Sequence, residues 1–184
     1  YANANSSYLF AFIGQSSVCT ATDAMDGLEL LNTSAVTNMC AMFWRFGSNA
    51  MTSFSLPDNF VTENVTNMDQ MFLLMGYNAM TSLSLGSNFN TSNVTTMYEM
   101  FSECGSQKLT SLDLGDKFDT SKVINMNAMF RNLGEISLTS LNLGEKFNTI
   151  NVTSMDRMFR SCGHNKLTSL DLGDLFYTLK VTSM

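Results

Sequence analysis

Residues 109–134 read LTSLDLGDKFDTSKVINMNAMFRNLG, and this stretch is one complete example of the pattern that decides the fold. In its first part Leu112 and Leu114 alternate with polar residues, which is the two-residue period of a strand with one buried side. In its second part apolar residues recur at steps of three, three, one and three: Val123, Met126, Met129, Phe130 and Leu133. That spacing is typical of one face of a helix, so the stretch predicts a strand, a turn and a helix in succession.

The pattern recurs with a strict 29-residue period, without insertion or deletion, from Leu31 to Met184. A valine marks the same place in each unit: Val36, Val65, Val94, Val123, Val152 and Val181. A strict period of this length predicts a solenoid, because one unit can bury its apolar side only against the next. The expected fold class is α/β: a right-handed solenoid similar to leucine-rich repeats, with a parallel sheet on one face and short helices on the other.

Each unit carries a threonine and a glycine that would bound the expected helix. Thr120 is expected to act as N-cap, because its hydroxyl can accept a hydrogen bond from a free amide of the first turn. Gly134 is expected to close the helix as a left-handed C-cap, about 13 residues later.

The repeat also predicts the domain boundaries. Residues 1–30 match it poorly and are expected to form a divergent N-terminal repeat or cap. Residues 31–176 contain five 29-residue repeats, and residues 177–184 begin a truncated sixth repeat, so we expect the natural protein to continue. Trp44, Leu73 and Leu74 stand where later units have polar residues, which suggests that the N-terminal segment lies over them.

Composition argues against several function classes. The 184-residue chain is 45% hydrophobic and 14% charged, with a formal net charge of −6. Such an acidic chain is not expected to bind nucleic acid, and no apolar run is long enough for insertion of this segment into a membrane. His164 is the single histidine, and no catalytic, phosphate-binding or zinc motif occurs. We therefore expect no enzyme activity, no cofactor and no metal.

The sulfur-containing residues are expected in the core. The methionines share helix-face positions with valine and phenylalanine, where they would fill space between turns. Cys104 and Cys162 occupy the same position two units apart, which places their Cα atoms ~10 Å apart, beyond the ~7 Å reach of a disulfide. A bond between Cys19 and Cys40 across an N-terminal cap remains open.

The candidate interaction face is the outward side of the predicted strands. Its side chains are small and polar: Ser53, Ser55, Ser82, Ser84, Ser111, Asp113, Ser140, Asn142, Ser169 and Asp171. Such a face should bind weakly in each unit and gain strength by repetition. The following turn carries a more acidic row, which leaves calcium binding as an alternative: Asp58, Ser87, Asp116, Glu145 and Asp174. The regular Ser and Thr grid leaves ice binding as another.

Residues 90–104, NTSNVTTMYEMFSEC, followed by LTSLDL at residues 109–114, resemble the BspA-like leucine-rich repeat surface proteins of bacteria, including mycoplasmas, and of some protists. The resemblance covers residues 31–184, although many members have units of about 25 residues. It implies a cell-surface or extracellular protein that acts in adhesion or host contact, and it supplies no catalytic residues.

Three functions follow as hypotheses. The first is a non-enzymatic cell-surface or secreted repeat module for adhesion or protein–protein interaction, with a protein or cell-surface ligand. The alternative is a structural spacer, or a self-assembling stalk or filament module that associates end to end. The third is a calcium- or ice-binding surface.

Overall fold

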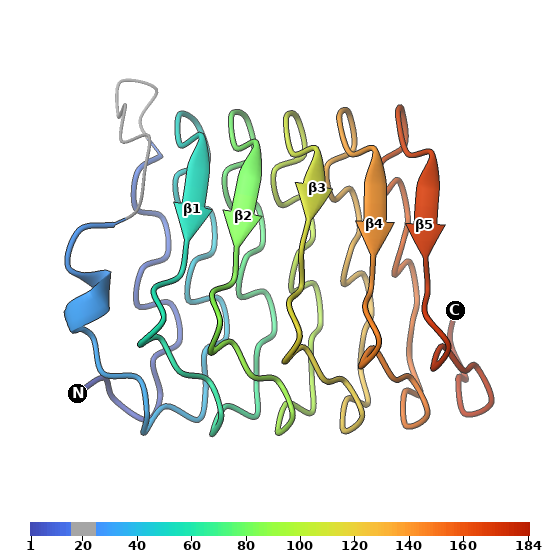
Figure 1. The fold of residues 1–184 in the computed structure, drawn as a ribbon, viewed down its shortest axis with the longest axis horizontal. Helices are drawn as coiled ribbons and strands as arrows, with labels where there is room; N and C mark the ends of the chain where they lie inside the picture. The colour runs from blue at the N-terminus through green and yellow to red at the C-terminus, as the bar shows by residue number, and fades with distance from the viewer. Residues whose placement is uncertain (16–24) are drawn as a thin grey trace.

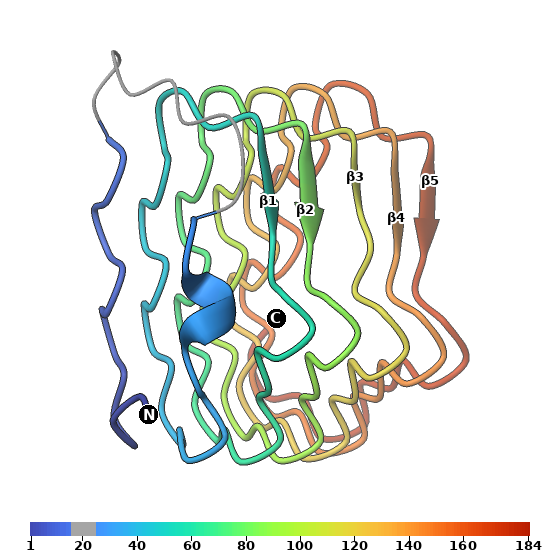
Figure 2. The ribbon, with the colours of Figure 1, turned by 60° about the vertical axis from the view of Figure 1, so that its left-hand side comes forward.

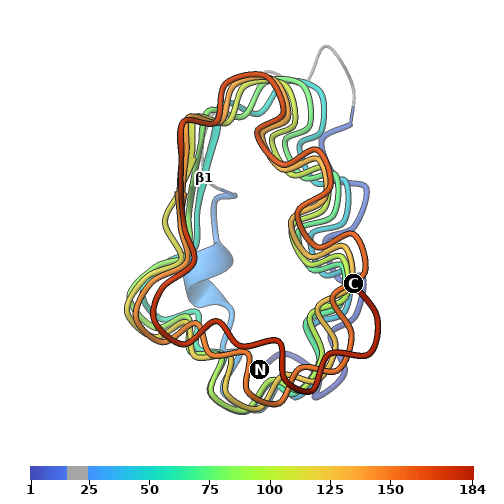
Figure 3. The same ribbon diagram turned by 90° about the vertical axis from the view of Figure 1, so that its right-hand side faces the viewer.

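The computed structural model describes residues 1–15 and 25–184. Successive coils of the chain stack side by side along one axis (Figure 1). The elements within these described residues are one short 3-10 helix and five short strands: η1 (Leu28–Leu30), β1 (Ser53–Ser55), β2 (Ser82–Ser84), β3 (Ser111–Leu112), β4 (Ser140–Asn142) and β5 (Ser169–Asp171). Viewed along the stack, the coils nearly superimpose, with the strands on one side and zigzag turn segments on the opposite side (Figure 3).

The strand side pairs equivalent residues of successive coils. Every strand pairing is parallel, and Ser53 lies opposite Ser82, just as Ser140 lies opposite Ser169, one sequence period later in each case. The order is β1-β2 in one sheet and β3-β4-β5 in the other, with a single parallel bridge from Ser84 to Asp113 between them. Side chains therefore repeat in rows along the stack.

The opposite side corrects the predicted fold class. The described residues contain no α-helix there, so the expected α/β class and its short helices are wrong. In the first full coil the amides of Met42, Trp44 and Phe46 close turns onto carbonyls three residues earlier, at 3.0–3.2 Å. The intervening amides leave the coil, because Ala41 donates to Asp69 O at 2.8 Å in the next one. The chain is thus a series of overlapping turns joined along the axis.

Left-handed residues make this turn series. Ala41 and Arg45 have φ of 54° and 56°, and the equivalent residues of each later coil also have positive φ. Gly47 has φ of 55° at the position expected for a C-cap, so the left-handed conformation is present although there is no helix to cap. Residues with a side chain lose ~1–2 kcal/mol each in this region, so the axial hydrogen bonds have to offset that cost.

Thickness explains why turns replace helices. A helix with its side chains is about 10 Å across, whereas neighbouring strands lie about 4.8 Å apart. Coils that carried helices on one side would have to fan apart. The turn segments need only the spacing of the strands, so the two sides stack in step and the coils in Figure 1 run parallel. Inward side chains still follow the spacing of three, three, one and three, which is why the sequence resembles a helix.

The expected N-cap threonines have another role. The Thr120 hydroxyl donates to Asn148 O at 2.9 Å and accepts from Asn148 N at 2.8 Å, so it bridges two coils. Thr33, Thr62 and Thr91 make the same donation to the next coil. These side chains are at most 1% exposed. The threonine row is a buried polar ladder between coils.

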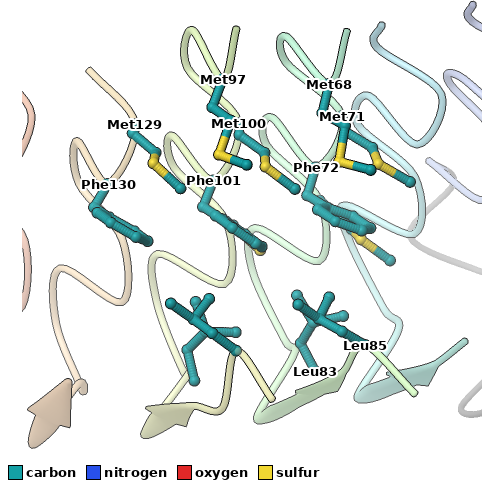
Figure 4. Packing of buried hydrophobic residues seen from close by; sticks show 14 of the residues in the cluster. Met68, Met71, Phe72, Leu83, Leu85, Met97, Met100, Phe101, Met129 and Phe130 are labelled. Carbon is teal, nitrogen blue, oxygen red and sulfur yellow. The ribbon is translucent and has the colours of Figure 1, made fainter. Parts of the chain in front are cut away.

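The core lies between the two sides and consists of continuous columns (Figure 4). Phe72 stacks on Phe101, and Phe101 on Phe130, with ring centroids 5.3 and 5.8 Å apart. Met97 and Met100 are fully buried beside this column, in agreement with their expected role as core residues. Each coil therefore buries its apolar side against its neighbours.

The N-terminal segment begins the stack with a partial coil. Asn5 bridges to Asn38, and Tyr8, Phe10 and Phe12 donate axial hydrogen bonds to the first full coil at 2.8–3.0 Å. The segment thus repeats the turn geometry. The number of residues between Asn5 and its partner Asn38 is larger than the regular period that separates Asn38 from Asn67. Helix η1 follows and lies at the same end of the stack (Figure 2), with Leu28 buried in the core.

Candidate functional site

The strand face contains the ten residues that the sequence identifies as an interaction face. Nine of them are exposed and Ser53 is half-buried, while the alternate residues Leu83, Leu112 and Leu141 point into the core. The parallel register aligns Ser111, Ser140 and Ser169 in one row. The structure therefore brings the predicted residues together as two small polar rows.

Three polar residues of this face also hold the turn that follows each strand. Asp113 Oδ1 accepts the amide of Gly115 at 2.9 Å, and Asp171 Oδ1 accepts that of Gly173 at 3.0 Å. Asn142 does the same for Gly144 at 2.8 Å. These side chains are fixed rather than free to adapt, which favours repeated shallow contact over enclosure of a ligand.

A groove opens beside the strand face, in the turns that follow β3 and β4. A Cβ on Gly86 would lie 2.6 Å from Leu56 O, whereas one on Gly115 or Gly144 would meet nothing within 4 Å. A cavity of about 540 Å³ lies between these two turns, lined in part by Asp113, Asp116, Asn142, Glu145 and Lys146. Its lining mixes three carboxylates with one ammonium group.

The acidic row next to this groove shows no metal geometry. Asp58 Oδ1 accepts the Ser87 hydroxyl at 2.7 Å, and this bond, with the Ser87 amide, lowers the pKa of Asp58. Within residues 1–15 and 25–184, no three His, Cys, Asp or Glu side chains are close enough to hold an ion together. His164 is exposed in a turn.

The zigzag side carries a second surface. Sequence reasoning identified only its apolar residues Trp44, Leu73 and Leu74, as covered by the N-terminal segment. The rings of Tyr8 and Phe12 do contact Trp44. We call this surface the turn face: the outward side chains of residues 5–14, 38–47, 67–76, 96–105, 125–134 and 154–163. All four arginines of the chain and its single tryptophan lie on it. Their positions between the apolar columns were visible in the sequence, but the helix hypothesis directed attention to the strands.

Aromatic rings occupy one end of the turn face. Trp44 contacts Phe12, with centroids 4.7 Å apart and planes at 57°, and Tyr8 at 6.0 Å and 60°. Tyr8 and Phe12 are about half exposed, and the exposed Arg45 follows Trp44 in the chain. The three rings form a notched apolar patch with a cation beside it.

An ion network occupies the middle of the turn face. Arg131 lies 3.1 Å from Glu103 and 3.6 Å from Glu99, and its Nε donates to the Ser102 hydroxyl at 3.1 Å. The Gln70 amide donates to the other oxygen of Glu99 at 2.8 Å. The network joins three successive coils, and the charges of both glutamates are paired with Arg131 within it.

Two exposed arginines occupy the far end. Arg157 Nε lies 3.5 Å from Asp156 Oδ2, but the two side chains are 60% and 44% exposed, so this pair is weak. Arg160 forms no ion pair with any described residue. The turn face therefore has a ring cluster at one end, the ion network and the exposed Tyr98 ring in the middle, and two exposed arginines at the far end.

The three cysteines in the described part of the chain are buried or half-buried thiols. Cys104 and Cys162 are buried, as expected from their row, and burial raises the pKa of both thiols, that of Cys162 to about 12. Burial and the nearby Asp69 carboxylate raise the pKa of the half-buried Cys40 thiol. Cys19 lies outside the described residues, and so does its proposed bond to Cys40.

Comparisons with known proteins add one family. A model of the family described as "Mycoplasma protein of unknown function, DUF285" matches residues 15–108 and 45–171. No curated protein and no solved structure matches the chain. No helix in the described part of the chain has the length and apolar character needed to cross a membrane.

Proposed function

The chain belongs to this family of Mycoplasma proteins of unknown function, and from that premise we propose that it is a non-enzymatic repeat module for adhesion or protein–protein interaction. The observation that carries the proposal is the register of its coils. Because equivalent residues pair at one coil spacing, a partner meets similar groups again and again along a fixed frame.

Repetition matters because each coil offers little alone. A row such as Ser111, Ser140 and Ser169 presents one hydroxyl in each coil, and a single exposed hydroxyl binds weakly. Several contacts made together raise the overall affinity well above that of one contact. A rigid row also loses little conformational freedom on binding.

The proposed location is the cell surface or the extracellular space. The resemblance of residues 90–114 to BspA-like surface proteins supports it. The test is mild protease treatment of intact cells that express the chain, followed by detection of the turn segments by mass spectrometry. Release of these peptides from intact cells supports the location, and their protection until the cells are lysed contradicts it.

Adhesion can be measured with coated microspheres. Beads that carry the full chain should bind to host epithelial cells more strongly than beads coated with albumin. Protease treatment of the host cells should remove the difference if the ligand is a protein. Equal binding by the two kinds of bead would contradict the proposal.

Matched variants assign the binding to a face. Lysines placed at Ser82, Ser111 and Ser140 alter exposed side chains of the strand face and leave the core intact. If the strand face binds, bead adhesion falls in this triple variant. Lysines at Asn64, Thr95 and Ser87, which are also exposed and lie off the strand rows, form the control.

A structural spacer or self-assembling module is the second candidate. The constant parallel register favours it, because equivalent residues of successive coils pair in the same way along the described strands. Sedimentation velocity over a concentration series tests self-association. Growth of the particle with concentration supports assembly, and a constant monomer mass argues against it.

A further inference from the structure

The turn face offers two separate kinds of contact at its two ends. Near the first coils, the half-exposed rings of Tyr8 and Phe12 flank Trp44. Near the last full coil, Arg157 and Arg160 are exposed; within the described part of the chain, Arg157 has one weak pair with Asp156 and Arg160 has no ion pair. Tryptophan, tyrosine and arginine are the residue types that dominate the energetics of protein interfaces.

The middle of the face is already satisfied. Arg131 engages Glu99 and Glu103, so neither glutamate is left to repel an incoming carboxylate at full strength. A ligand that crosses this section meets one exposed ring, that of Tyr98, while the charges of Glu99 and Glu103 are already paired with Arg131. The ring cluster and the exposed arginines lie at the two ends.

The distance between the ends sets the length of a ligand. Trp44 and Arg160 occupy equivalent positions four coils apart, and four strand spacings amount to roughly 20 Å. An extended polypeptide advances about 3.3 Å per residue, so about six residues cover that distance.

We propose that the turn face binds an extended segment of a partner protein that carries apolar side chains at one end and carboxylates about six residues away. The apolar side chains pack on Tyr8, Phe12 and Trp44, and the carboxylates pair with Arg157 and Arg160. The inference rests on the proposed function as a protein-contact module, and it identifies the surface and the partner chemistry.

Ring geometry favours a peptide over a carbohydrate. The planes of Phe12 and Tyr8 are tilted by 57° and 60° from that of Trp44, which makes a notch rather than a flat platform. A branched aliphatic side chain fills a notch, whereas stacking of a flat ring system needs a flat surface. An anionic oligosaccharide is the alternative to a peptide ligand, and the test includes one.

The test uses synthetic peptides and the emission of Trp44, the single tryptophan of the chain. The first peptide joins a Leu-Leu pair to a Glu-Glu pair through six Gly and Ser residues. The second has a two-residue spacer, and the third has Lys-Lys in place of Glu-Glu. We expect a saturable emission change with the first peptide and at least threefold weaker binding of the other two. A sulfated oligosaccharide serves as the fourth ligand.

Two double variants of the full chain locate the carboxylate contact. Arg157→Gln with Arg160→Gln should weaken binding of the first peptide about threefold to tenfold, the range for two exposed ion pairs. The control is Lys117→Gln with Lys146→Gln, which removes two exposed cations from the turn after the strands and should leave affinity unchanged. Phe12→Ala should weaken the binding of all three peptides, because each of them carries the Leu-Leu pair.

Three results would overturn the inference: no saturable change with the first peptide, equal affinity of the arginine variant and the native chain, or binding of the oligosaccharide without the peptide. If microsphere adhesion then depends on the strand-face serines, the proposed function stands and the turn-face inference alone fails. If adhesion is absent as well, both fail.

Discussion

The two sides of the stack reach the same axial spacing by different backbones. On the strand side, two or three residues in each coil pair with equivalent residues one period later. On the turn side, alternate amides point along the axis while the others close turns, and left-handed residues such as Glu99 and Glu103 make this alternation. The spacing of inward side chains does not by itself determine the backbone, because the stack also requires every side to be equally thin.

The two sides also differ in chemistry. The strand face has small hydroxyl, carboxylate and amide groups, and its outward residues include no arginine or aromatic residue. The turn face holds Trp44 and all four arginines. A partner that needs a few strong contacts would use the turn face, and one that gains affinity through repetition would use the strand face.

Loss of a core ring should have the largest effect on stability. Phe101 is fully buried and stacks on Phe72 and Phe130, so Phe101→Ala should lower the free energy of unfolding by about 3–5 kcal/mol. Ser111→Ala, on the exposed strand face, should change it by less than about 0.5 kcal/mol. Urea unfolding of the two variants measures both values. Similar losses in the two variants would contradict the burial of Phe101 in a core and the exposure of Ser111.

A pair of glycines tests how tightly each region is packed. A Cβ on Gly105, which ends a turn segment, would lie 2.5 Å from Leu109 Cβ at a φ of 52°, so Gly105→Ala should cost about 2–4 kcal/mol. Gly115 follows β3 with φ of 76° and nothing within 4 Å, so Gly115→Ala should cost only about 1–2 kcal/mol. Thermal unfolding gives the ranking, and the reverse order would contradict the packing described.

The buried threonine ladder can be compared with an exposed threonine. Thr120→Val keeps the side-chain shape but removes both hydrogen bonds to Asn148, so it should cost about 1–3 kcal/mol. Thr110 is exposed beside β3, and Thr110→Val should stay within about 0.5 kcal/mol. Equal stability of the two variants would show that the bridge between coils contributes nothing.

A substitution at a left-handed position should have the smallest effect on the free energy of unfolding, but the sign of that effect distinguishes turns from a helix. Ser161 has φ of 56° in a turn segment, where glycine is less strained, so Ser161→Gly should stabilise the chain by about 0.5 kcal/mol. In a helix the same change would destabilise by several tenths of a kcal/mol. Chemical unfolding measures whether this variant is more or less stable than the native chain, with Ser111→Ala as the reference substitution. A loss of stability would support the helix hypothesis.

The sequence predicts the period and the inward residues but not the turn backbone. Val123, Met126 and Phe130 are buried, as a helix would also bury them. Left-handed conformations are hard to foresee at Gln70 or Arg157, because such residues seldom adopt positive φ. The limit on coil thickness that excludes helices is a property of the stack, and no single unit reveals it.

The partial coil at the N-terminus is hard to recognise in the sequence for a simpler reason. Asn5, Phe10 and Gly14 match Asn38, Phe43 and Gly47 at a step longer than the regular period, so a search at that period does not detect them. The strand rows were predictable from alternation alone. The turn face was predictable only where Trp44 indicated a cover by the N-terminal segment, because the other outward residues vary from coil to coil.

Far-UV circular dichroism of the purified chain tests the central claim, that turns and not helices cover the side opposite the strands. The turn architecture predicts a spectrum without the paired negative minima of α-helix, unchanged in shape until the chain unfolds. A native spectrum with those minima, at the strength expected for a helix of about 13 residues in each unit, would contradict the account.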